Sequence, residues 1–145
     1  MVSNKKMFRI AITILVVIAA VISVYMIFFR PRKISEFCGG DVDKFQSVYI
    51  IDGNTGDSAK LGKEDYESVY NILNEITYKP IYDKQKVGWS YRIQITVDDK
   101  MTDIVFSSSK CEINGKQYAV SGKNYEQQLA NLYERTKDVY LNKSY

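Results

Sequence analysis

Residues 89–121 read WSYRIQITVDDKMTDIVFSSSKCEINGKQYAVS, and this stretch decides the fold class. Apolar and polar residues alternate along much of it, which is typical of strands buried on one face only. Asn114-Gly115 is the pair best suited to a type I′ hairpin turn, because both positions need positive φ. The stretch therefore predicts an antiparallel meander of strands at 89–97, 101–107, 110–113 and 116–121.

Helical periodicity flanks the meander on both sides. Residues 63–77 place apolar side chains at spacings of three and four, and residues 124–140 repeat this pattern with Asn124 as the N-cap. Further strands are expected at 47–52 and near 78–82. This order predicts an α+β fold, a two-layer domain in which an antiparallel meander sheet carries two helices on one face. The other face of the sheet stays open and is the natural place for function.

The most apolar segment, residues 10–29, carries no charge. As a helix its 20 residues span roughly 30 Å, the thickness of the hydrocarbon core of a bilayer. The run ends in Ile27-Phe28-Phe29-Arg30, without a small-x-small cleavage site, so we expect an uncleaved signal-anchor helix. The residues before Cys38 do not form a lipobox, which argues against lipidation. The sequence thus predicts a single-pass membrane protein that contacts the lipid bilayer through residues 10–29.

The remaining segments are assigned around this helix. Pro31 ends it, and the residues that follow show neither helical nor strand periodicity. We expect a basic cytoplasmic tail at 1–9, the transmembrane helix at 10–29, a linker at 30–44, a soluble α+β domain at 45–141 and a C-terminal tail at 142–145.

Charge is unevenly distributed along the chain. The first 33 residues hold six Lys and Arg and no acid, whereas residues 34–145 hold 14 basic and all 17 acidic residues, a net charge of −3. A nucleic-acid-binding function therefore lacks electrostatic support. Positive charges nearly balance across the apolar segment, but a very short N-terminal tail usually stays in the cytoplasm. We expect an extracytoplasmic domain, with a cytoplasm-facing accessory subunit of a membrane complex as the alternative.

Two small residues in the apolar segment, Ala19 and Ser23, form a small-xxx-small pair. Such pairs let two helices approach closely, so a weak homodimer is one interpretation. Small residues that simply face lipid are the other.

Catalytic motifs are scarce. The chain has no His, the usual general base and the commonest metal ligand, and it has no nucleophile-elbow, P-loop or dinucleotide-binding pattern. Carboxylate-only chemistry on an envelope polymer would need Asp98, Asp99, Asp103 and Glu112 to approach one another, and solvated turn and edge acids are the alternative. We expect a domain without catalytic activity and without a cofactor.

Metal ligands are equally scarce. Residues 52–57, DGNTGD, have oxygen-bearing side chains at short spacing, as calcium loops do. An EF-hand would need Gly at the sixth position and Glu at the twelfth, where this chain has Asp57 and Lys63. A polar turn after a strand is the simpler interpretation, and no metal site is assigned.

The two cysteines are Cys38, in the expected linker, and Cys111, on an expected strand. In an oxidising compartment they could form a disulfide that closes a loop of about 70 residues and adds about 4 kcal/mol. The alternative is two separate thiols, with Cys111 a small buried core residue.

Tyrosine is abundant, with 12 in the chain, and suits surfaces that recognise a partner. Trp89, with Tyr82, Lys84 and Lys86 in the loop before it, forms a candidate binding patch for a protein, peptide or cell-wall ligand. The alternative is a plain hairpin loop with solvated lysines and with Trp89 in the core.

The layout of a short basic tail, one apolar helix and a strand-helix-meander-helix domain resembles uncharacterised small membrane-anchored extracytoplasmic proteins of Gram-positive bacteria. The resemblance covers the whole chain and is one of architecture. It implies an extracytoplasmic accessory or sensory role and assigns no functional residue.

Overall fold

The computed structural model describes residues 4–83 and 88–141, with side chains up to residue 137. The chain divides into two compact units, Met1–Arg30 and Pro31–Tyr145. Each unit is described by itself below.

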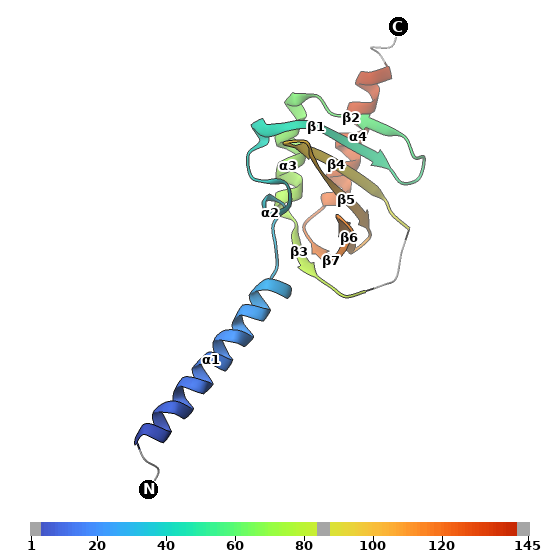
Figure 1. Cartoon of the computed structure of the whole chain (residues 1–145). Coiled ribbons are helices and arrows are strands. Elements are labelled where there is room, and N and C mark those ends of the chain that lie inside the picture. Colours follow the sequence, from blue (N-terminus) through green and yellow to red (C-terminus); the bar gives the residue numbers. More distant parts are fainter. Residues whose placement is uncertain (1–3, 84–87, 142–145) are drawn as a thin grey trace. The chain divides into compact units, whose positions relative to one another are not determined.

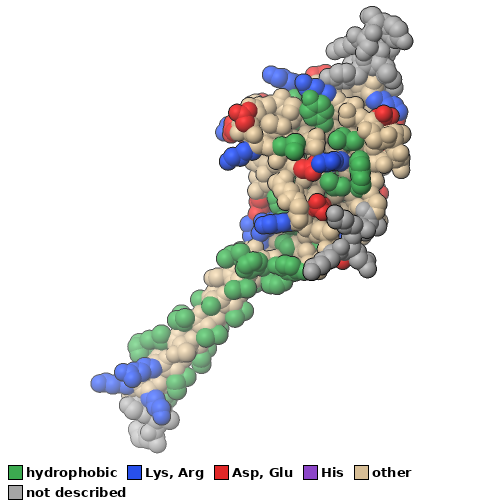
Figure 2. Space-filling model, turned by 45° about the vertical axis from the view of Figure 1, so that its right-hand side comes forward, with side chains coloured by type: hydrophobic (Ala, Val, Ile, Leu, Met, Phe, Trp, Pro, Cys, Tyr) green, Lys and Arg blue, Asp and Glu red, His purple; other side chains and the backbone are tan. Residues whose placement is uncertain are grey.

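The first unit is helix α1 (Asn4–Phe28), whose most apolar window has a mean hydropathy of 2.9. Hydrophobic side chains cover much of its surface, and Lys and Arg gather toward its N-terminal end (Figure 2). The hydroxyls of Thr13 and Ser23 donate to the carbonyls of Arg9 and Ala19, at 3.0 and 2.8 Å, so both are satisfied within the helix. By length and composition α1 is a candidate membrane-spanning helix.

The second unit is built on a seven-stranded antiparallel sheet in the order β2-β1-β4-β5-β6-β7-β3 (Figure 1). The α+β fold expected from the sequence is thereby confirmed. The strands are β1 (Phe45–Asp52), β2 (Ser58–Lys60), β3 (Thr77–Pro80), β4 (Tyr91–Val97), β5 (Lys100–Ser107), β6 (Lys110–Ile113) and β7 (Lys116–Ser121). Strand β2 was not expected, because its three residues are too few to show an alternation.

Two hairpin turns set the register of the meander. Asn114 and Gly115 have φ of 50° and 81°, as the expected type I′ turn between β6 and β7 requires. Asp98 and Asp99, with φ of 48° and 60°, make the corresponding turn between β4 and β5. Short polar turns with residues that tolerate positive φ therefore fix which residues of β4 and β5, and which of β6 and β7, lie opposite one another.

Helices α3 (Tyr66–Glu75) and α4 (Tyr125–Leu141) lie on one face of the sheet, behind the strands in Figure 1. Their apolar residues meet the inward residues of the strands in one core. Three short helices complete the unit: α2 (Ser35–Cys38), η1 (Val42–Lys44) and η2 (Lys63–Asp65).

Residues 30–44 differ from the expected linker. Ile34 is fully buried and Cys38 is 5% exposed, and both belong to the core. Arg32 forms an antiparallel bridge with Tyr78 of β3. We call residues 31–38 the strap. The strap shows no local periodicity because its contacts are with strands and a helix that lie far along the chain.

Candidate functional site

The sheet has a face that neither α3 nor α4 covers (Figure 1). Alternate residues of β1, β4, β5 and β6 point away from the core, and in mid-strand they are half-buried by their neighbours. We call this surface the open face. Its central residues are Tyr49, Ile51, Arg92, Gln94, Thr96, Asp103, Val105 and Glu112.

Strand register arranges these side chains in rows across the sheet. One row runs Tyr49, Gln94, Asp103, and the next runs Ile51, Arg92, Val105, Glu112. Apolar and polar side chains alternate along the second row, whereas the first row places two polar residues, Gln94 and Asp103, beside Tyr49. Figure 2 shows hydrophobic, acidic and basic side chains next to one another on the viewed face of this unit.

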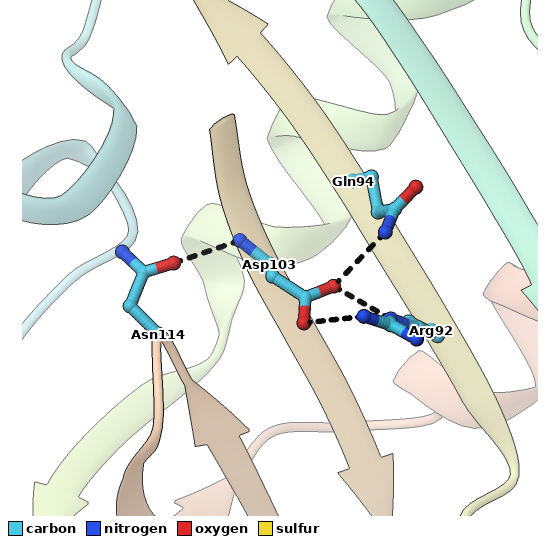
Figure 3. Close-up of polar contacts among 4 residues, drawn as sticks. All are labelled: Arg92, Gln94, Asp103 and Asn114. Carbon is cyan, nitrogen blue, oxygen red and sulfur yellow. Dashed lines mark hydrogen bonds and ion pairs between the residues drawn. The ribbon is translucent and has the colours of Figure 1, made fainter. Parts of the chain in front are cut away.

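An ion pair lies between the two rows. The Arg92 guanidinium donates from Nε to Oδ1 of Asp103 at 2.7 Å and from Nη2 to Oδ2 at 2.9 Å (Figure 3). The two side chains are 39% and 23% exposed. This bidentate geometry fixes both groups more firmly than a single contact would, and the hydrogen bond to Asp103 raises the pKa of Arg92.

Two further residues hold Asp103 in place. The side-chain amide of Gln94 donates to Oδ1 of Asp103 at 3.4 Å (Figure 3). The backbone N–H of Asp103 donates to Oδ1 of Asn114 at 2.9 Å. The carboxylate therefore already accepts hydrogen bonds from Arg92 and Gln94. These hydrogen bonds hold both carboxylate oxygens in a fixed orientation on the open face.

The other acids of the expected cluster lie elsewhere on the sheet. Asp98 and Asp99 are exposed in the β4–β5 turn, where the Asp99 backbone N–H donates to Gln46 Oε1 at 3.0 Å. Glu112 faces Val105 across the β5–β6 pair. Within residues 4–83 and 88–141, no group of three or more His, Cys, Asp or Glu side chains is placed to hold a metal ion.

Residues 52–57 form a self-contained polar turn. Asp52 Oδ1 accepts from the backbone N–H of Asn54 at 2.8 Å, and Thr55 Oγ1 accepts from that of Asp57 at 3.1 Å. These oxygens stabilise the connection between β1 and β2, as the simpler interpretation of this fragment requires.

The candidate patch before β4 is described only in part. Tyr82 is 76% and Trp89 36% exposed, so Trp89 is not a core residue. Lys84 and Lys86 lie outside the described residues. Hydrogen bonds join the segment around Trp89 to β5, from Ser107 Oγ to Gly88 O at 2.7 Å and from Ser90 N to Phe106 O at 2.8 Å.

Both cysteines are free thiols buried in the core, and no disulfide joins them. Burial raises the pKa of Cys38 to about 11 and also raises that of Cys111. The Tyr78 hydroxyl donates to the carbonyl of Leu73 at 3.0 Å, and burial, together with both thiols, raises the pKa of Tyr78. Protonated thiols are poor nucleophiles, so neither cysteine has the properties of a reactive one.

No protein-family model matches this chain, and neither the curated proteins nor the solved structures contain a significant match.

Sequence reasoning did not single out Arg92 and Gln94. Their alternation with apolar residues assigns them to the outer face of β4. Counting back from the Asp98-Asp99 turn would have paired Gln94 with Asp103, since the two are opposite in the observed register. The signal was therefore present, but it depends on knowing the turn type.

Proposed function

We propose that this chain is a membrane-tethered extracytoplasmic domain that binds a protein or peptide through the open face and has an accessory or sensory role without catalysis. The observation that carries the proposal is the fixed Arg92–Asp103 pair beside half-buried apolar side chains on the face that α3 and α4 leave uncovered. Arginine and tyrosine surrounded by apolar residues are typical of the centre of a recognition surface.

The form of the surface supports a macromolecular ligand. Small-molecule sites are concave and enclosed. Two hollows of ≈ 480 and ≈ 520 Å³ lie beside α3, on the helix side of the domain, and contain no open-face residue. A sheet face with exposed rows of side chains fits the flat surface of a protein or an extended peptide better.

The proposed location follows from α1 and its charges. Lys5, Lys6 and Arg9 precede the apolar run, and positive charges at that end favour its location on the cytoplasmic side, with the domain translocated. A weak homodimer through Ala19 and Ser23 stays a prediction, since the Ser23 hydroxyl bonds to its own helix.

Orientation is tested by placing one new thiol at either end of the chain. Ser68 is exposed on α3 and Lys5 lies before the apolar run. The native thiols are buried, so wild-type protein serves as the unlabelled control. With a membrane-impermeant maleimide on intact cells, we expect Ser68→Cys to be labelled and Lys5→Cys to be labelled only after lysis. The reverse pattern would support the cytoplasm-facing accessory subunit instead.

The binding surface is tested by site-specific photocrosslinking in cells. A photoreactive residue in place of Tyr49, on the open face, should capture a discrete partner, and one in place of Asn71, exposed on α3, should not. Capture through Tyr49 should be lost when Val105→Arg adds a charge beside Arg92, while circular dichroism shows the domain folded. Equal capture from both positions, or capture unaffected by Val105→Arg, would refute the assignment of the open face.

A further inference from the structure

Two polar residues of the strap, Arg32 and Lys33, form hydrogen bonds with the edge strand β3 and with the C-terminal end of α3. Arg32 exchanges two backbone hydrogen bonds with Tyr78 of β3, at 2.8 and 3.0 Å. The Lys33 ammonium donates to the carbonyls of Asn74 and Ile76, at 3.1 and 3.4 Å. These carbonyls lie at the C-terminal end of α3, where the helix dipole favours a positive charge.

The apolar half of the strap is part of the core. Ile34 is fully buried. The Phe37 ring packs edge-on against Tyr78 and Tyr118, with centroids 5.9 and 5.3 Å apart, and its carbonyl accepts from the Thr102 hydroxyl at 3.2 Å. The strap therefore contacts β3, β5 and β7 at once, and it cannot detach without opening the core.

This attachment shortens the connecting segment between the apolar helix and the domain. Only Phe29, Arg30 and Pro31 separate the end of α1 from Arg32. At up to about 3.6 Å per residue, the steps from Phe28 to Arg32 span about 14 Å at most, at any angle of α1. A free segment from Phe28 to Phe45 would span about 60 Å.

We propose that the strap is a conformational restraint that holds the domain within a short, fixed reach of the membrane in which α1 is embedded. The domain then cannot extend into outer layers of the envelope. The open face, if it has the proposed binding function, serves partners that are themselves at the membrane surface. The restraint itself does not depend on that binding function.

Two variants, each with the same insertion of nine Gly and Ser residues, test whether residues 31–38 act as a docked strap or as part of a free linker. One is placed between Arg30 and Pro31, before the strap, and the other between Gly39 and Gly40, after it. The full chain is reconstituted in vesicles with an acceptor dye on the lipid headgroups and a donor dye on Ser68→Cys. We expect the first insertion to lower the energy transfer at least twofold and the second to leave it unchanged, because the path from α1 to the docked strap is unaltered.

Each other result would overturn the proposal. Equal losses from both insertions would mean that residues 31–44 act as a free linker. No loss from either would mean that another surface holds the domain at the membrane. Amide hydrogen exchange of the uninserted chain is an independent check: the N–H groups of Arg32 and Tyr78 should exchange as slowly as those of β4, and fast local exchange would contradict a docked strap.

Discussion

At the residue scale, Asn114 has two functions in the hairpin. Its φ of 50° is one that Asn tolerates and most residues do not, and its Oδ1 accepts from the backbone N–H of Asp103 at 2.9 Å. We expect Asn114→Ala to lower the free energy of unfolding by about 2 kcal/mol, and Asn114→Gly by about 1, since Gly removes only the hydrogen bond. Urea unfolding of the chain in detergent measures both. The exposed Lys116→Ala is the control, and a cost equal to that of Asn114→Ala would contradict the argument.

The Arg92–Asp103 pair is the second residue-scale case. Because the Arg92 side chain is 39% exposed, water screens the interaction, and the pair stabilises the fold less than a buried pair would. A double-mutant cycle with Arg92→Ala and Asp103→Ala should give a coupling energy of roughly 0.5–1 kcal/mol. The Glu134–Lys137 pair on α4, an ion pair at i,i+3 spacing, is the comparison and should couple more weakly. A larger coupling in the control pair would show that the bidentate geometry adds nothing.

At the scale of elements, the strap brings residues that follow the apolar helix in the sequence into the core of the domain. Ile34→Ala removes a fully buried side chain and should cost about 3 kcal/mol of unfolding free energy. Lys44 is exposed and lies after the strap, within residues 30–44. Lys44→Ala should change the unfolding free energy by less than about 0.5 kcal/mol. Chemical denaturation followed by circular dichroism compares the two. Equal and small effects would mean that the strap does not stabilise the domain.

The whole molecule has a core rich in protonated thiols and phenols, which predicts instability at high pH. Burial raises the pKa of Cys38 from 9.0 to about 11 and that of Tyr125 from 10.0 to about 12. The unfolded chain releases these protons first, so their contribution to stability is complete below about pH 9 and is lost as pH rises through the folded-state values.

Unfolding free energy measured from pH 8 to 11 should therefore fall, at up to about 1.4 kcal/mol per pH unit for each such proton. Cys38→Ala should decline less steeply between about pH 9 and 11, because it lacks one of these groups. An equal slope in both proteins would show that Cys38 is not buried.

Some features of this molecule follow from local sequence patterns, and others depend on contacts between residues far apart in the chain. Local sequence patterns were enough to predict the apolar helix, the meander, the helices at α3 and α4 and the turn at Asn114-Gly115, because hydrophobic periodicity and turn chemistry act over a few residues. By contrast, long-range packing makes Cys38 a core residue and makes residues 31–38 a strap instead of a linker. The contacts of the strap, such as Arg32 with Tyr78, join residues far apart in the chain and leave no periodic pattern between them.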